Sequence, residues 1–539
     1  MTPPVLTPTG RGSAGSVPVL PEARLGGPMP WVIAIMVALT VLAAGGALAL
    51  ANFVVVLDTT IANVAIPHMQ SSLGATADTV TWVLTSYIIA SAVAMPITGW
   101  LSDRIGARRL FIGSVASFIF ASMLCGMAQN LTEMVLFRAF QGVAGAFIAP
   151  LSQSFMLDTT RPSKQPQMMA IWGMGVMIGP ILGPVLGGWL TENWDWRWVF
   201  YVNLPVGVLS LAILMAELPQ REISRRRFDI AGFVLIGLAL ASFQLFLDRG
   251  QQEDWFESVE IWIYAGMAAG AAWMGVIHLA TARAPLFSTR LFADRNFSIA
   301  LGIMLVMGVV MFAPMALLPP MLQHLFGYGV IDTGLVLMPR GVGVLISMQL
   351  AGLAIRRGID ARPVIVFGFL LMSLSLWIMA HWSLSVDQFH VVATGTLQGL
   401  GMGLVFIPLN ISAFATLPPQ LRTEGSSLLN LLRSLGASIG ISLSTVLLTR
   451  NLQTVHEGLA GHVTGGVGSL IDYSTIDRYQ RLGDVALSVL DAEVTRQSAM
   501  VAYIDDFYLM GWLCLAAVPL TLLMRRNGAG SPPPAVVAD

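Results

Sequence analysis

Residues 99–111 read GWLSDRIGARRLF, a short basic turn between two long apolar stretches at 79–100 and 109–128. The glycines permit a tight turn, and Asp103 can pair with arginines or with a helix N-terminus across a helix interface. The pattern predicts a loop that joins two membrane helices and latches one arrangement of them. An ordinary basic turn is the alternative interpretation.

The composition places the whole chain in a membrane. Of the 539 residues, 55% are hydrophobic and only 11% are charged. A membrane-spanning helix needs about 20 apolar residues, so the chain holds many such segments and a soluble core is excluded. The net charge of -1 argues against a nucleic-acid partner. The two cysteines, Cys125 and Cys514, lie in apolar segments, which excludes a disulfide framework and a CxxC metal site.

Apolar runs between polar breaks predict an all-α protein with about fourteen membrane-spanning helices. They are expected at about 33–57 (with a possible extension to Ile66), 79–100, 109–128, 132–155, 167–190, 198–217, 229–248, 260–281, 297–322, 332–354, 363–381, 389–411, 425–449 and 506–524. Arginine and lysine concentrate in alternate loops, as at 104–109, 161–164, 221–227 and 356–362. The positive-inside rule therefore predicts that these loops and both termini are cytoplasmic.

A weak internal repeat predicts two homologous six-helix bundles. The pairs related by an offset of 257 residues are Gln141 and Gln398, Gly142 and Gly399, Pro150 and Pro408 (one residue further), Gly179 and Gly436, and Gly183 and Gly440. Chance similarity in a glycine-rich chain is the alternative. The expected divisions are a flexible tail at 1–30, a bundle at 31–217, a basic linker with two extra helices at 218–296, a second bundle at 297–524 and a tail at 525–539. The second bundle includes a long loop at 451–505, with an amphipathic stretch at 479–494.

Asp58 lies within the apolar stretch VVVLDTTIANVAIP, residues 54–67. An aspartate near the middle of a membrane helix costs about 2.5–3.5 kcal/mol, so it usually lines a wet cavity or carries protons. Arg138, inside the span at 132–155, is its expected partner, and a change in their separation would alter the proton affinity of Asp58. Two alternatives remain open: Asp58 at a helix end, and Arg138 in a purely structural role.

The stretch GMGVMIGPILGPVLGG, residues 173–188, predicts a bent helix that packs closely against a neighbour. Its glycines recur every four residues and its prolines lie beside them: Gly175, Gly179, Gly183 and Gly187, with Pro180 and Pro184. A generic packing stripe is the alternative. The residues expected to line a substrate cavity are the polar Asn63, Gln141 and Arg433 and the aromatic Trp82, Tyr87 and Phe406.

These motifs resemble those of the major facilitator superfamily. The turn at 99–111 resembles its signature loop, G-x-L-x-D-R-x-G-x-R-R, through Gly99, Asp103, Arg104, Gly106, Arg108 and Arg109. The glycine stripe resembles the motif typical of its antiporters. The stretches VLDTTIANVAIP, WDWRWVFYVNLPVG and NLLRSLGASIG are similar to the fourteen-helix drug:proton antiporter branch, and most of all to EmrB-type inner-membrane components of tripartite pumps.

The resemblance implies a proton-coupled antiporter that exports hydrophobic or amphipathic toxic compounds across a bacterial inner membrane by alternating access. Asp58 and Arg138 would couple protons, no other cofactor would be needed, and the 451–505 segment would contact an EmrA-like adaptor and, through it, a TolC-like channel. An importer or uniporter of the same fold for a small amphipathic metabolite is the alternative. An enzyme is not expected, because the chain lacks GxxxxGK[ST] and HExxH motifs and nucleophile clusters.

Overall fold

The computed structural model describes residues 28–161, 164–219, 223, 227–250, 252–465 and 484–525. Throughout this part of the chain the regular structure is helical, and fourteen helical segments are long and apolar enough to cross a membrane. The predicted fold class and number of spans are therefore confirmed. Both predicted tails, apart from the residues next to the first and last helices, lie outside the described residues, as does most of the basic stretch at 220–226.

The first six spans form one bundle. Its elements are α1 (Pro28–Ser72), α2 (Ala77–Val80), α3 (Trp82–Ala94), η1 (Met95–Ile97), α4 (Thr98–Ile105), α5 (Ala107–Met127), α6 (Leu131–Ala146), α7 (Ile148–Thr159), α8 (Gln165–Asn193), α9 (Trp198–Tyr201) and α10 (Asn203–Glu217). Helix α1 packs against α8 and α10, and α6 packs against α3 and α5. Helix α1 begins earlier than predicted, at Pro28. It also ends later, at Ser72, because Pro67 is accommodated inside the helix instead of ending it.

Two further spans follow and lie beside the first bundle. The elements are α11 (Ile230–Arg249), η3 (Trp255–Glu257), α12 (Val259–Thr281) and the short α13 (Thr289–Ala293). Helix α11 packs on α3, and α12 packs chiefly on α11. Most of α12 is exposed in the isolated chain, so these two helices form a peripheral layer.

The last six spans form the second bundle. Its elements are α14 (Arg295–Phe326), α15 (Val330–Arg356), α16 (Ala361–Met379), α17 (Gln388–Ala415), η4 (Pro419–Leu421), α18 (Arg422–Gly465) and α20 (Asp484–Leu522). Helix α15 packs on α17, α14 on α18, and α16 on α17 and α20. The bundles meet where α8 runs along α15 and where α18 crosses α4 and α7.

The glycines of the internal repeat make the same close approaches in both bundles. A Cβ atom on Gly142 would lie 2.4 Å from the carbonyl oxygen of Tyr87, and one on Gly399 would lie 2.0 Å from that of Arg340. Both positions therefore require glycine for two helices to touch. The shared geometry supports the interpretation of two homologous bundles.

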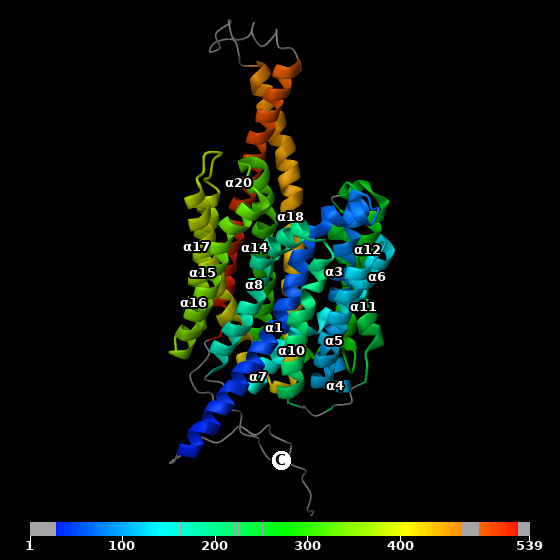
Figure 1. The fold of residues 1–539 in the computed structure, drawn as a ribbon, viewed down its shortest axis with the longest axis vertical. Helices are drawn as coiled ribbons and strands as arrows, with labels where there is room; N and C mark the ends of the chain where they lie inside the picture. The colour runs from blue at the N-terminus through cyan, green and yellow to red at the C-terminus, as the bar shows by residue number, and fades with distance from the viewer. Residues whose placement is uncertain are drawn as a thin grey trace, which may run out of the picture.

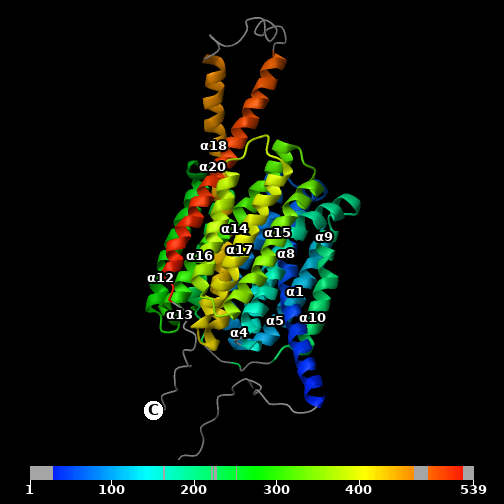
Figure 2. The same cartoon turned by 90° about the vertical axis from the view of Figure 1, so that its left-hand side faces the viewer.

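Helices α18 and α20 continue well beyond the other helices at one end of the molecule (Figures 1 and 2). We call this the hairpin end, and the opposite end, which carries the turn at Gly106, the basic end. The prediction of a loop from 451 to 505 was wrong for 451–465 and 484–505, which are helical. The polar residues that interrupt the apolar pattern here do not prevent helix formation. Residues 479–483 of the predicted amphipathic stretch lie outside the described residues.

Candidate functional site

Asp58 lies at the centre of a polar cluster inside the first bundle. Arg138 Nη1 donates to Asp58 Oδ2 at 2.6 Å, and both side chains are 0% exposed. Gln141 Nε2 and Asn203 Nδ2 donate to Asp58 Oδ1 at 2.9 and 2.7 Å. We call these four residues the Asp58 cluster. The predicted contact between Asp58 and Arg138 is therefore present, and Asp58 does not lie at a helix end.

Helix geometry brings the cluster together from three spans. Arg138 and Gln141 are three residues apart on α6 and so share one face, where Arg138 Nη1 also donates to Gln141 Oε1 at 2.8 Å. Asn203 is the first residue of α10. Arg138 Nε donates to the carbonyl oxygen of Val83 at 3.1 Å, which ties the cluster to α3 as well.

Aromatic rings enclose the guanidinium group of Arg138. Its Cζ atom lies 4.4 Å from the centre of the Tyr87 ring and 5.7 Å from that of Phe200. Such cation–π contacts stabilise a cation while keeping water away from it. Arg138 Nη2 and Asn203 Oδ1 have no hydrogen-bond partner among the described residues. The cluster therefore contains one donor group, Arg138 Nη2, and one acceptor, Asn203 Oδ1, that could take part in another hydrogen-bonding arrangement.

In the Asp58 cluster the negative charge of Asp58 balances the buried positive charge of Arg138. Removing one member of a buried ion pair leaves an uncompensated charge and costs about 3–5 kcal/mol. The packing of α1 against α6 and α10 at this point therefore depends on the Asp58–Arg138 pair. A role in proton coupling remains a prediction for Asp58 and Arg138.

Asn203 was missed by the sequence reasoning. Besides Asp58 it contacts Ser122, whose Oγ accepts from Asn203 Nδ2 at 3.0 Å. Cys125 also approaches the cluster, with Sγ 3.5 Å from Gln141 Oε1. The available signal was the single amide within the apolar run VFYVNLPVG at 199–207. Nothing in the sequence spacing connects that amide with Asp58, because they are 145 residues apart.

The glycine stripe of α8 lies directly on the segment of α1 that carries Asp58. A Cβ atom on Gly179 would lie 2.9 Å from a Val56 methyl group, and one on Gly183 would lie 2.3 Å from Thr60 Oγ1. Thr60 Oγ1 also donates to the carbonyl oxygen of Gly179 at 3.2 Å. Gly175 and Gly187 make equally close approaches to α1, while Pro180 and Pro184 lie within the continuous helix. The predicted close packing is confirmed.

The turn at 99–111 lies at the bundle interface. Gly106 has φ +94°, a conformation that favours glycine, and caps α4. A Cβ atom on Gly99 would lie 3.2 Å from Glu424 Cβ on α18, and Arg108 Nη2 donates to the carbonyl oxygen of Met215 at 2.6 Å. Asp103 is half-buried, and Arg104 and Arg109 are exposed. Gly99 thus lies against the second bundle, while the pairing of Asp103 and the latch remain predictions.

A row of polar contacts joins the two bundles at the basic end, and the sequence reasoning missed it. Arg422 pairs with Asp158 at 2.7 Å, and Ser154 and Thr423 hydrogen-bond at 2.8 Å. Gln153 Nε2 donates to Asn410 Oδ1 at 2.6 Å.

Gln153 and Asn410 are separated by 257 residues, which is the offset of the internal repeat. Two residues related by an internal two-fold axis can touch each other only close to that axis. The neighbouring pair Pro150 and Pro408 has an offset of 258, so Gln153 and Asn410 lie within one residue of equivalent positions, close to the pseudo-symmetry axis where the bundles meet.

The structure separates the residues predicted to line one substrate cavity. Arg433 and Phe406 line a narrow recess between the bundles that is too tight to hold a water molecule, together with Trp172, Met304, Asn410, Leu429 and Asn430. Gln141 and Tyr87 instead belong to the surroundings of Asp58, inside the first bundle. Trp82 is half-buried and Asn63 is exposed, and neither lines the recess. Hydropathy could not predict this separation, because it does not show which face of a helix meets the other bundle, and a substrate role for these residues remains a prediction.

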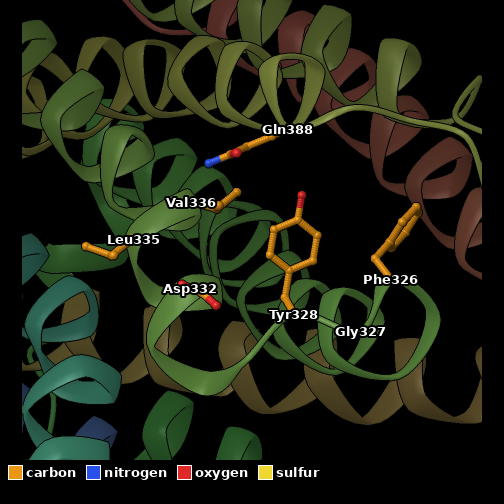
Figure 3. A pocket seen from close by; sticks show the side chains of 7 residues that line it. All are labelled: Phe326, Gly327, Tyr328, Asp332, Leu335, Val336 and Gln388. Atoms are coloured by element: carbon orange, nitrogen blue, oxygen red, sulfur yellow. The ribbon is translucent and has the colours of Figure 1, made fainter.

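A larger hollow of about 420 Å³ opens at the hairpin end of the second bundle. It lies where the turn after α14 meets the beginnings of α15 and α17, and Tyr328 extends into it near Gln388 (Figure 3). None of the predicted site residues lines it. Within the described ranges, no group of three or more His, Cys, Asp or Glu side chains is placed to hold a metal ion.

Comparison with known proteins agrees with this architecture. The family model for the Major Facilitator Superfamily matches residues 48–441. The multidrug export protein EmrB of Escherichia coli (strain K12) is 33% identical over 489 residues, which cover 90% of this chain and 95% of that protein. The fatty acid resistance protein FarB of Neisseria gonorrhoeae is 33% identical over 494 residues, 90% of this chain and 96% of that protein.

A solved structure of the proton:xylose symporter XylE shares the fold. Its TM-score is 0.59 at 12% sequence identity, covering 91% of this chain and 97% of XylE. At this identity the similarity shows the fold alone. The family match and the long alignments with multidrug exporters support a narrower assignment, to a family and a type of transporter. The chain belongs to the major facilitator superfamily and is an EmrB-like, multi-pass membrane transporter of the multidrug efflux type.

Proposed function

We propose that the protein is a proton-coupled antiporter that exports hydrophobic or amphipathic compounds across the bacterial inner membrane. The observation that carries the proposal is the fully buried Asp58 cluster, a titratable group held by a cation and two amides. Buried carboxylates of this kind in membrane helices typically serve proton or ion pathways. The name of the multidrug export protein EmrB, a relative, supports export as the direction.

In this mechanism a proton binds Asp58 and cancels its attraction to Arg138. The change acts on α1, which packs along the glycine stripe of α8, and α8 in turn packs along α15 of the second bundle. Loss of the ion pair would thus bias how the two bundles sit against each other. Each unit charge moved across the membrane is worth about 2.3 kcal/mol per 100 mV, before any pH difference is added.

Alternating access follows from the two-bundle architecture as part of the proposal. The contacts Asp158–Arg422 and Gln153–Asn410 hold the bundles together at the basic end, which the positive-inside rule makes cytoplasmic. These contacts would have to break for a compound to enter from that side. Gln153→Cys and Asn410→Cys, in a chain with Cys125→Ala and Cys514→Ala, should be joined readily by a short bifunctional thiol reagent at rest and less readily with a transported compound. Unchanged cross-linking during active transport would contradict the mechanism.

The hairpin of α18 and α20 is the proposed contact for a periplasmic, EmrA-like adaptor, through which a TolC-like channel would be reached. The hairpin projects beyond the rest of the helices, and His456 on one arm contacts Asp491 on the other at 3.1 Å (Figures 1 and 2). Shortening both arms should leave transport by proteoliposomes intact and abolish drug resistance of whole cells. Loss of both activities would count against an adaptor site.

The deciding experiment is dye efflux from proteoliposomes with an imposed pH gradient, comparing wild type, Asp58→Asn and the matched control Glu192→Gln. Glu192 is an exposed carboxylate on α8, so its variant removes a charge without touching the Asp58 cluster. We expect gradient-driven efflux in wild type and control, and none in Asp58→Asn. Wild-type efflux that does not depend on the pH gradient would refute proton coupling. Coupled efflux in Asp58→Asn would place the proton site elsewhere.

A further inference from the structure

A hollow of about 330 Å³ opens at the basic end, where the peripheral helices meet the first bundle. It lies between α4, the chain that leads into α11, and the loop that joins α12 to α13. Helices α12 and α13 lie at the edge of the molecule (Figure 2). Among the described residues the lining holds one acid, Asp229, and three arginines, Arg227, Arg283 and Arg290, so its net charge is +2. We call it the arginine hollow.

The three arginines of this hollow are available to a ligand. Arg227, Arg283 and Arg290 are exposed, and none of them has an ion pair or a hydrogen bond within the described part of the chain. Asp229, by contrast, already accepts hydrogen bonds from two backbone amides and contacts His278 Nε2 at 2.8 Å. An anion that enters the hollow would therefore meet three cations without partners and a carboxylate that is already hydrogen-bonded on several sides.

The loop that carries two of the arginines is held in a defined shape. The Leu286 amide donates to Asp229 Oδ2 at 3.0 Å, which ties the loop to the start of α11. The Ser288 amide donates to Glu424 Oε1, which ties it to α18 of the second bundle. Phe287, between these two anchors, is only 2% exposed. The fold itself therefore forms the hollow, and a ligand does not have to order the loop.

The arginine hollow adjoins an apolar surface that no other part of the described chain covers. The face of α12 near its end exposes Trp273 by 71%, Val276 by 63% and Ile277 by 48%. Such a face on a membrane helix meets lipid acyl chains. Trp100 also lines the hollow, and its ring lies 4.4 Å from that of Phe228. Tryptophan is enriched at the level of the lipid headgroups, so the hollow lies where hydrocarbon gives way to water.

We propose that the arginine hollow binds the headgroup of an anionic phospholipid from the leaflet at the basic end, with the acyl chains lying along α12. The inference does not depend on the proposed export function. Guanidinium groups match phosphate oxygens in paired hydrogen bonds, and basic pockets beside membrane helices favour anionic headgroups. The hydroxyl groups of Ser288 and Thr289 line the same hollow and can bond to the glycerol part. A zwitterionic lipid is disfavoured, because its ammonium group would meet the arginines.

The test is phospholipid binding to the full-length protein in dodecyl maltoside micelles, with the bound lipids counted by native mass spectrometry. The probes are phosphatidylglycerol and phosphatidylcholine with the same acyl chains. Arg283→Gln/Arg290→Gln removes two cations from the hollow, and Arg283→Lys/Arg290→Lys keeps their charge. The matched control is Arg356→Gln/Arg357→Gln, which removes two exposed arginines that do not line the hollow. Thermal unfolding without added lipid shows whether each variant is folded.

We expect wild type to bind its first phosphatidylglycerol at least about tenfold more tightly than its first phosphatidylcholine. Arg283→Gln/Arg290→Gln should lose most of this preference and keep its phosphatidylcholine affinity within about a factor of two. The lysine variant should keep part of the preference, and the control should keep all of it. An unchanged preference in the glutamine variant would overturn the proposal. An equal loss in the control would show only a general attraction to basic residues and would overturn it too.

Two measurements on wild type distinguish a lipid from a soluble anion. Inorganic phosphate in excess, at constant ionic strength, should not displace phosphatidylglycerol, because it gains nothing from the apolar face of α12. Displacement would point to a soluble phosphate compound and would overturn the lipid assignment.

In nanodiscs, phosphatidylglycerol with a photoreactive diazirine on its acyl chain should label peptides from the end of α12 above all others. This measurement needs no substitution, so it remains valid if a variant fails to fold. Labelling spread evenly over the lipid-facing helices would contradict the proposed site.

Discussion

The two bundles share their backbone packing but differ in how they treat buried charge. Gly142 touches the backbone at Tyr87, and Gly399 touches the backbone at Arg340 in the same manner. By this packing, Arg340 occupies the position of Tyr87, and by the repeat offset Gly395 occupies the position of Arg138. In the first bundle Arg138 lies against the ring of Tyr87. In the second bundle an arginine, Arg340, takes the position that corresponds to Tyr87.

The second bundle lacks the counterion as well. Helix α14 carries no acidic residue between Arg295 and Phe326, whereas α1 carries Asp58. Arg340 Nη2 donates to the Met311 carbonyl oxygen at 3.2 Å, and no ion pair is described for it. The contrast shows that helix contact requires the same shape in both halves, while among the described residues a fully buried ion pair occurs only in the first.

The largest expected effect comes from removing the counterion of Arg138 in the first bundle. Asp58→Asn leaves Arg138 buried without a counterion and should cost about 3–5 kcal/mol of unfolding free energy, besides abolishing coupled efflux. Unfolding in mixed micelles measures the stability. Adding Arg138→Gln should recover much of the stability and none of the coupling. A double variant as unstable as Asp58→Asn would show that the charge is not the cause.

Equal disruption of both bundles is expected from alanine at the paired glycines. Gly142→Ala and Gly399→Ala each push a methyl group against a backbone carbonyl, so each should lower the unfolding free energy by about 1–3 kcal/mol. Gly113→Ala and Gly302→Ala are the controls, since a Cβ atom there meets nothing within 4 Å. These controls should gain about 0.5–1 kcal/mol, as expected for alanine in place of a helical glycine. Strongly unequal losses at 142 and 399 would weaken the repeat.

Opposite effects are expected from methionine at the paired glutamines. Gln398 is 0% exposed and neither of its amide atoms has a partner in the described part of the chain, so Gln398→Met should be neutral or stabilise by about 1 kcal/mol. Gln141→Met removes a donor from Asp58 and should destabilise by about 1–3 kcal/mol. The same micelle unfolding assay compares them. A loss of stability in Gln398→Met would mean that this amide has a bonding role.

The smallest effect concerns the inserted helices, which belong to neither bundle. Asp229 caps α11 and accepts hydrogen bonds from the Gly232 amide at 2.9 Å, the Leu286 amide at 3.0 Å and His278 Nε2 at 2.8 Å. Burial alone would raise the pKa of Asp229, but these hydrogen bonds and the charge of His278 outweigh burial and lower it below the ordinary value.

A lowered pKa in the folded state means that the ionised carboxylate stabilises the fold above the ordinary value of about 3.9 and stops doing so as the pH falls through the folded value. Asp229→Ala should cost about 1 kcal/mol at pH 7 through loss of the cap. Asp229→Asn should keep the cap and lose less stability than wild type between pH 5 and pH 3. Parallel pH curves for wild type and Asp229→Asn would contradict this assignment.

How far the sequence predicts this molecule depends on the range of the interaction concerned. Apolar length predicted the fourteen spans, and the spacing of Gly179 and Gly183 predicted a close helix contact, because both are local properties of one helix. The Asp58–Arg138 contact could be predicted because few charges are available inside the membrane. Asn203 could not, since many amides compete for such a role, and its place at Asp58 depends on how α10 returns to α1.

The amide pair Gln153–Asn410 has a consequence for the origin of the molecule. If the two bundles descend from one that paired with its own copy, the residue on the symmetry axis had to bond to itself. A carboxylate or an ammonium cannot do so, because each would meet a like charge, but a carboxamide both donates and accepts. The present chain has a long amide on one side and a short one on the other, joined at 2.6 Å. Gene fusion would have freed the two sides to differ in length while keeping a chemistry that allows self-recognition.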